Sequence, residues 1–230
     1  MNTYRQNASI VGVLLIIGFV GILSLTLTGP ILDDPDYLVE ISVNKNRIIS
    51  GVLVQLIMAF ATASIAIWLY PVLKKYHEAL ALGAASFRII EGVFQIVSAV
   101  SLLALLTLSQ DFVKAGAPDS SHFQTLGGLL LAGRDWVGQV ATILPWILGA
   151  LMYYYVFYQT KLVPRWLSVW GLVGSVLAIV ATMLFMFGFI AAFSPNQVML
   201  MLPIASQEIV LAIWLIAKGF NSDVIASQFA

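Results

Sequence analysis

Six long apolar runs, separated by short polar segments, constrain this sequence more than any other feature. A helix needs about 20 apolar residues to cross the roughly 30 Å hydrocarbon core of a bilayer, and each run reaches that length. We therefore predict an all-α fold: a polytopic membrane bundle of six transmembrane helices, in one domain over residues 1–230. The helices are expected at approximately 9–28, 47–70, 79–109, 125–158, 166–193 and 198–220, with a polar loop at 110–124.

Composition supports a membrane protein and excludes several other classes. The chain is 60% hydrophobic and only 10% charged, whereas a soluble domain is about 25% charged. Formal net charge is zero, so no broad basic surface is available and no nucleic-acid partner is expected. Cysteine is absent, and His77 and His122 fall in predicted loops on opposite sides. We therefore expect no metal site and no cofactor, and the expected surrounding is the lipid bilayer.

The distribution of basic residues predicts the orientation. Lys and Arg near the ends of membrane spans gather on the cytoplasmic side. The side that holds the N-terminus carries six of them, and the other side carries three, Lys45, Arg47 and Lys114. This difference predicts a multi-pass protein of the cytoplasmic membrane with both termini in the cytoplasm. The acidic loop at 31–46 then faces outward.

The third apolar run carries a polar stripe. Arg88 and Glu91 are three residues apart, and Gln95 and Ser98 continue the same helix face. A charge at the centre of a spanning helix costs roughly 2.5 to 3.5 kcal/mol on insertion scales, so it needs a partner or a use.

Glu208, in the sixth run, is the expected partner of this stripe. At 1.5 Å per residue, Arg88 lies roughly 14 Å from the inner end of its helix and Glu208 roughly 15 Å from the inner end of the sixth. We therefore predict that Arg88 pairs with Glu208, Glu91 or both, between the third and sixth helices.

Further polar residues extend the list of binding or ion-pair candidates. They are Gln55 in the second helix, Arg134, Asp135 and Gln139 in the fourth, and Gln207 beside Glu208. The fourth run would be about 51 Å long as one helix, so its outer end is expected to project or to lie at the membrane surface. Arg134 and Asp135 are then expected at the outer headgroups. Adjacent residues point roughly 100° apart on a helix, so this pair is not expected to satisfy itself.

Three functional classes fit these candidates. The preferred one is a non-enzymatic protein that binds a small molecule, a lipid or a protein partner through the polar cluster between helices three, four and six. The alternatives are a small secondary transporter, proton-coupled through Glu91 or Glu208, and an intramembrane enzyme. A purely structural polar clamp explains the same residues equally well.

The chain also resembles a family of uncharacterised bacterial membrane proteins catalogued as a domain of unknown function. The resemblance rests on three segments: Phe87-Arg88-Ile89-Ile90-Glu91, Leu162-Val163-Pro164-Arg165-Trp166-Leu167, and Gln207-Glu208 through Trp214 to Lys218-Gly219. It implies a single six-helix domain in a bacterial cytoplasmic membrane, and it implies no activity, substrate or cofactor. It places the polar motif residues of the family on Arg88, Glu91 and Glu208. Gln207 stands where the family has a small residue.

Overall fold

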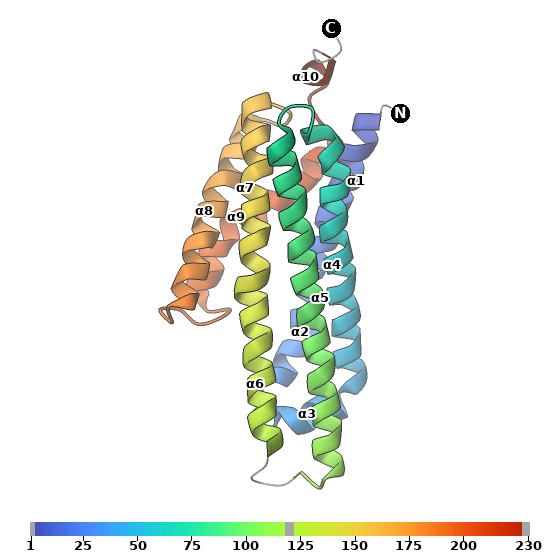
Figure 1. Cartoon of the computed structure of the whole chain (residues 1–230), viewed down its shortest axis with the longest axis vertical. Coiled ribbons are helices and arrows are strands. Elements are labelled where there is room, and N and C mark those ends of the chain that lie inside the picture. The colour runs from blue at the N-terminus through green and yellow to red at the C-terminus, as the bar shows by residue number, and fades with distance from the viewer. Residues whose placement is uncertain (1–2, 118–121, 227–230) are drawn as a thin grey trace.

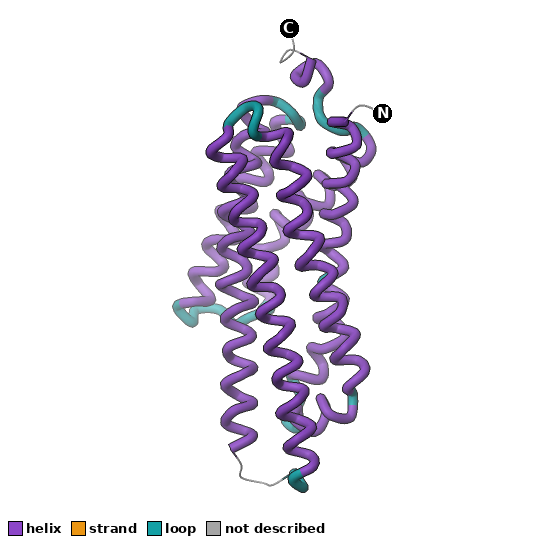
Figure 2. The backbone as a smooth tube through the Cα atoms, turned by 45° about the vertical axis from the view of Figure 1, so that its right-hand side comes forward, coloured by secondary structure: helices purple, strands orange, loops and turns teal. Residues whose placement is uncertain are grey.

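The computed structural model describes residues 3–117 and 122–226, which form helices and connecting turns without a strand among them (Figures 1 and 2). The tip of the loop expected at 110–124, residues 118–121, lies outside the described residues. The elements are α1 (Thr3–Val20), α2 (Ile22–Leu32), α3 (Tyr37–Val43), α4 (Lys45–Leu73), α5 (Glu78–Lys114), α6 (His122–Trp136), the π-helical turn η1 (Val137–Thr142), α7 (Ile143–Thr160), α8 (Arg165–Met186), α9 (Pro195–Ala217) and α10 (Ser222–Ala226).

Six helical stretches among these elements are long and apolar enough to cross a membrane, so the chain is a multi-pass membrane protein. They are 3–32, 45–73, 78–114, 122–160, 165–186 and 195–217. Each overlaps one of the six predicted helices. The described ends of the chain, at α1 and α10, lie at the same end of the bundle (Figure 1).

Two segments differ from the expectation. The first helix is not continuous, because it breaks at Gly21, where a Cβ would lie 1.9 Å from the Sδ of Met58 on α4. The acidic loop expected at 31–46 contains the short helix α3. Leu38 and Ile41 of α3 are buried against α4 and α5, and this tertiary packing accounts for the extra helix.

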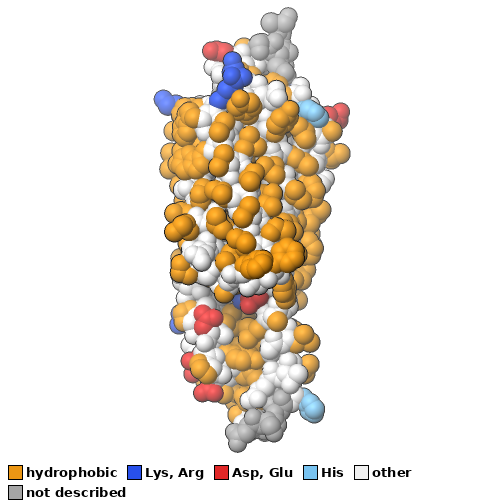
Figure 3. All heavy atoms as spheres, turned by 90° about the vertical axis from the view of Figure 1, so that its left-hand side faces the viewer, with side chains coloured by type: hydrophobic (Ala, Val, Ile, Leu, Met, Phe, Trp, Pro, Cys, Tyr) orange, Lys and Arg blue, Asp and Glu red, His pale blue; other side chains and the backbone are white. Residues whose placement is uncertain are grey.

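The crossing helices have unequal lengths. α8 and α9 contain 22 and 23 residues, about 33 Å each, whereas α5 has 37 and the α6–η1–α7 stretch has 39. The α8–α9 turn therefore lies partway along the bundle, and α3 and the far ends of α4, α5 and α6 extend beyond it (Figure 1). On the face shown in Figure 3, apolar side chains form a broad band with charged side chains above and below. The outer part of the expected fourth helix, α6, is among the elements that extend beyond this turn, as the length of that helix led us to expect.

The interior divides into two apolar clusters. One lies toward the termini and includes Leu69, Ala84 and Tyr154; the other lies toward α3 and includes Ile41, Val52 and Leu102. α5 contributes to both, and its polar stripe from Arg88 to Ser98 falls between its contributions to the two. The polar residues are therefore placed where neither apolar cluster fills the bundle.

Candidate functional site: a polar cavity inside the bundle

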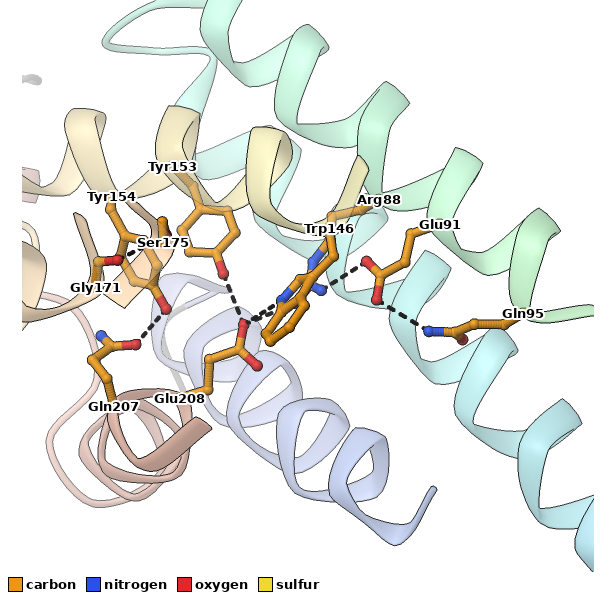
Figure 4. A network of polar contacts seen from close by, with 10 residues as sticks. All are labelled: Arg88, Glu91, Gln95, Trp146, Tyr153, Tyr154, Gly171, Ser175, Gln207 and Glu208. Atoms are coloured by element: carbon orange, nitrogen blue, oxygen red, sulfur yellow. Dashed lines mark hydrogen bonds and ion pairs between the residues drawn. The ribbon is translucent and has the colours of Figure 1, made fainter. Parts of the chain in front are cut away.

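A buried ion cluster joins α5 to α9. Arg88 Nη1 donates to Glu91 Oε2 at 2.8 Å, and Arg88 Nη2 lies 3.5 Å from Glu208 Oε1. Only 4%, 6% and 8% of the Arg88, Glu91 and Glu208 side chains are exposed. The pairing expected from helix spacing and depth is thus present, and Glu91 is the closer of the two partners (Figure 4).

Aromatic side chains of α7 hold Glu208. Trp146 Nε1 and Tyr153 Oη both donate to Glu208 Oε1, at 2.9 and 3.1 Å, and the Arg88 guanidinium carbon lies 5.9 Å from the centre of the Tyr153 ring. Figure 4 shows these donors converging on one oxygen of the carboxyl group. The other oxygen, Oε2, accepts no hydrogen bond from the residues that the structure describes.

Sequence reasoning did not identify Trp146 and Tyr153 as site residues. Their seven-residue spacing places them on one face of a helix, two turns apart, and both carry a polar tip within an apolar run. That spacing is the signal that could have found them.

The polar stripe of α5 continues away from the ion cluster. Gln95 Nε2 donates to Glu91 Oε1 at 3.1 Å. Gln95 is 5% exposed, yet its amide oxygen has no hydrogen-bond partner in the described structure. The amide oxygen of Gln55, and the Nε atoms of Arg88 and Arg134, are also buried without a partner. Buried polar atoms are nearly always paired, so these four atoms indicate a place for a polar ligand or for water.

These residues line a cavity of about 460 Å³, within the range of about 300–1,000 Å³ typical of small-molecule sites. Eight of the nine predicted candidates lie on its wall, namely Gln55, Arg88, Glu91, Gln95, Arg134, Asp135, Gln139 and Glu208. Most of the remaining wall is apolar, with Leu15, Phe19, Met58, Ile65, Met201 and Leu202 among its residues. α1 and α2 supply part of this wall, which the sequence did not lead us to expect.

The cavity opens on the side of the bundle between α2 and α9. Ile22 of α2 and Val198 and Leu202 of α9 line it, and more than half of each residue is exposed. α1 packs closely on α9, since a Cβ at Gly12 would lie 2.7 Å from the Ala212 carbonyl oxygen. Beyond the break at Gly21, α2 packs on α4 instead, where a Cβ at Gly51 would lie 2.4 Å from Thr28 Cγ2. The broken first helix therefore produces the opening.

A second polar group lies near the α8–α9 turn. Gln197 Nε2 donates to Gln139 Oε1 at 2.8 Å, and the Phe193 N–H donates to Gln197 Oε1 at 2.6 Å. Gln139 belongs to η1, and π-helical turns are frequent at functional sites. Gln197 is 3% exposed and was missed, because its Ser-Pro-Asn-Gln setting is typical of a solvated turn.

Arg134 and Asp135, about one helical turn before Gln139, differ from expectation in two respects. They do pair, with Arg134 Nη1 3.3 Å from Asp135 Oδ1, because the long Arg134 side chain spans the angle between adjacent positions. The Arg134 side chain is 13% exposed and that of Asp135 46%. Arg134 is thus largely buried at the cavity wall rather than solvated.

Gln207 is the one candidate that lies outside the cavity. It is fully buried, its Oε1 accepts from the Tyr154 hydroxyl, and its Nε2 donates to the Leu167 carbonyl at 3.0 Å. Gln207 therefore ties α9 to α7 and α8, facing away from Glu208 (Figure 4).

The bundle is closed on the termini side of Glu208. Tyr153, Tyr154, Phe157, Leu211 and Leu215 belong to one apolar cluster and are each at most 2% exposed. The cavity therefore extends from the ion cluster toward the α8–α9 turn and ends at these residues.

One comparison with known proteins gives a match. The model of the family described as Domain of unknown function (DUF4386) matches residues 10–219. No curated protein and no solved structure gives a significant match.

Proposed function

The chain belongs to the DUF4386 family, and from its geometry we propose that it is a non-enzymatic membrane protein that binds a small amphipathic molecule in the cavity. The polar group of the ligand is cationic or rich in hydrogen-bond donors, and it lies at Glu208. Its apolar part lies along the wall formed by α1, α2 and α9.

The charge balance of the ion cluster carries this proposal. One guanidinium, that of Arg88, faces two carboxyl groups, those of Glu91 and Glu208. Uncompensated charge is costly at membrane depth, so neutrality requires one more positive charge or a proton. The free oxygens on the wall, Glu208 Oε2 and the amide oxygens of Gln55 and Gln95, are acceptors. A ligand that donates hydrogen bonds or carries a cation would complement them.

The opening between α2 and α9 supports an amphipathic ligand. The residues at its edge are apolar and exposed, so a molecule dissolved in the bilayer would enter without crossing a polar surface. Small-molecule sites are mostly apolar with a few placed polar groups, and the wall of this cavity has that composition.

Secondary transport is a second candidate, favoured by the cavity reaching Glu208. A cavity that is closed on one side of a buried carboxyl group matches one state of an alternating-access cycle. The extra positive charge of the cluster would then be a proton or the transported cation.

We also propose that the protein lies in a bacterial cytoplasmic membrane with both termini in the cytoplasm, because basic residues gather near the end of the bundle that carries the termini.

A matched ligand series tests the binding proposal. Hexylammonium, hexanol and hexanoate share one apolar chain and differ in the charge of the polar group. Binding to the detergent-solubilised protein is measured by calorimetry and by the shift in unfolding temperature. We expect hexylammonium to bind most tightly and hexanoate not to bind.

Two variants and one control connect this binding to the cavity. Glu208→Gln removes the negative charge of the carboxylate. Gln55→Leu removes an amide oxygen that has no hydrogen-bond partner, so this substitution leaves no donor unpaired. Both should weaken hexylammonium binding, whereas Glu78→Gln, on the exposed first turn of α5, should not. Equal binding of all three compounds, or binding that both cavity variants leave intact, would contradict the proposal. Hexylammonium uptake into proteoliposomes distinguishes transport from binding.

A further inference from the structure

A second pocket lies at the end of the bundle that carries the termini. The turn between α7 and α8 and the segment after α9 meet there, because the Asn221 N–H donates to the Leu162 carbonyl at 2.9 Å. Leu162, Val163 and Phe220 are buried beneath the two segments and hold them in place. With Trp214 they form the floor of an open surface pocket of about 580 Å³, separate from the cavity at Glu208.

The backbone places basic residues around this pocket. Lys161 ends α7 with φ of 59°, and Gly219 follows α9 with φ of 76°. A Cβ at Gly219 would lie 2.9 Å from Arg5 Nη1, so both the conformation and the close approach require glycine there. Lys161, Arg165 and Lys218 line the pocket, and no acidic residue stands among its described lining residues.

Arginine side chains already bind the last carbonyls of α7 and α9. Lysine near a helix C-terminus usually offsets the partial negative charge of the last carbonyls. Here Arg5 donates to the carbonyls of Leu215 and Ile216, at 2.9 and 2.7 Å, and Arg165 Nε to that of Tyr158 at 3.4 Å. Within the described residues, the ammonium groups of Lys161 and Lys218 have neither a hydrogen bond nor an ion pair.

The pocket lies at the level where the spans end. α8 begins at Arg165 and α9 ends at Ala217, so the basic groups are placed where lipid headgroups lie. Trp166 and Trp170 form a ring pair 6.3 Å apart in the first turns of α8, and tryptophan is enriched at this level of a bilayer. Figure 3 shows basic side chains at this end, above the apolar band.

We propose that this pocket is a binding site for a phosphate-bearing anion, supplied by the headgroup of an anionic phospholipid. The Lys161 and Lys218 ammonium groups contact the phosphate. The N-cap of α8, Pro164, and its first residue, Arg165, also line the pocket, so the positive end of this helix lies beside it. This site is independent of the ligand proposed for the inner cavity.

Native mass spectrometry tests the site by counting bound lipids. The purified protein is titrated with dioleoylphosphatidylglycerol, with dioleoylphosphatidylcholine, and with inorganic phosphate. We expect the anionic lipid to bind preferentially. The double variant Lys161→Gln/Lys218→Gln should weaken its binding by about 30-fold, since each basic residue near an anionic headgroup contributes about fivefold.

The matched control is Lys74→Gln/Lys75→Gln, which removes the same charge at the same end of the bundle but outside the pocket. It should keep the affinity within about twofold, as expected for loss of a general surface field alone. Equal losses in both double variants, or no preference over phosphatidylcholine, would overturn the site. Displacement of the lipid by millimolar phosphate would identify free phosphate as the anion. Unfolding temperatures of both variants verify that each is folded.

Discussion

At the scale of single residues, the two carboxyl groups of the ion cluster have different surroundings. Glu91 is one helical turn from Arg88 and binds it at 2.8 Å, with Gln95 on its other oxygen. Arg88 Nη2 lies 3.5 Å from Glu208 Oε1, and the same oxygen accepts hydrogen bonds from Trp146 and Tyr153. Glu91 therefore neutralises Arg88, whereas Glu208 presents its second oxygen to the cavity.

This difference predicts unequal costs for two similar substitutions. Glu91→Gln removes the closer ion partner of Arg88 and leaves only Glu208 at 3.5 Å, so it should lower the free energy of unfolding by up to roughly 3 to 5 kcal/mol. Glu208→Gln should cost less, because Arg88 keeps Glu91 and the amide oxygen still accepts from Trp146 and Tyr153. Thermal unfolding in detergent measures both.

The exposed pair of Lys114 and Asp111 supplies the control for this comparison. Asp111→Asn should change stability by less than about 1 kcal/mol, because both side chains are more than half exposed. A Glu208→Gln variant less stable than Glu91→Gln would mean that Glu208 is the main partner of Arg88.

At the scale of elements, glycines set how closely the helices approach. A Cβ at Gly92 of α5 would lie 2.9 Å from the Ala59 carbonyl oxygen of α4, and a Cβ at Gly174 of α8 would lie 2.9 Å from the Ile204 backbone of α9. The obstacle in both places is backbone, which cannot rotate away. Small residues at such contacts are typical of membrane helix packing.

Gly174→Ala should therefore destabilise the bundle, because the added methyl group forces α8 and α9 apart. Overpacking of this kind typically costs about 1 to 3 kcal/mol. Gly133→Ala in α6 is the matched control: nothing lies within 4 Å of its Cβ position, and alanine should stabilise a helix by up to about 1 kcal/mol. If the unfolding temperatures of the two variants shift equally, close packing of α8 on α9 does not limit stability.

At the scale of the whole molecule, the six membrane-spanning stretches lie together toward the termini end, and a narrower portion extends beyond the α8–α9 turn (Figure 1). The cavity lies between the two apolar clusters, one in each part of the molecule. The hydrogen-bonded pair Gln139–Gln197, on the cavity wall near the α8–α9 turn, lies where the two parts meet. Binding in the cavity would therefore contact both parts of the molecule.

The proposed orientation is testable because the chain has no cysteine. Asp36→Cys lies before α3, and Asp223→Cys lies in α10 at the opposite end; both positions are exposed. A membrane-impermeant maleimide added to intact cells should label the first variant alone. Labelling of the second variant alone would show that the orientation is the opposite of the proposed one. Labelling of both variants after lysis verifies that each cysteine is reactive.

The sequence by itself determined the six helices and the Arg88 cluster. Apolar length and the cost of an intramembrane charge are properties of one segment, and helical rise places Arg88 and Glu208 at one depth before any packing is known. The tertiary structure alone decided that Gln207 faces away from the cavity, that Trp146 and Gln197 belong to it, and that the first helix breaks at Gly21. These outcomes depend on how each helix is rotated and which neighbour it contacts. Residues on different helices fix that rotation by close packing, so no single apolar run contains the information.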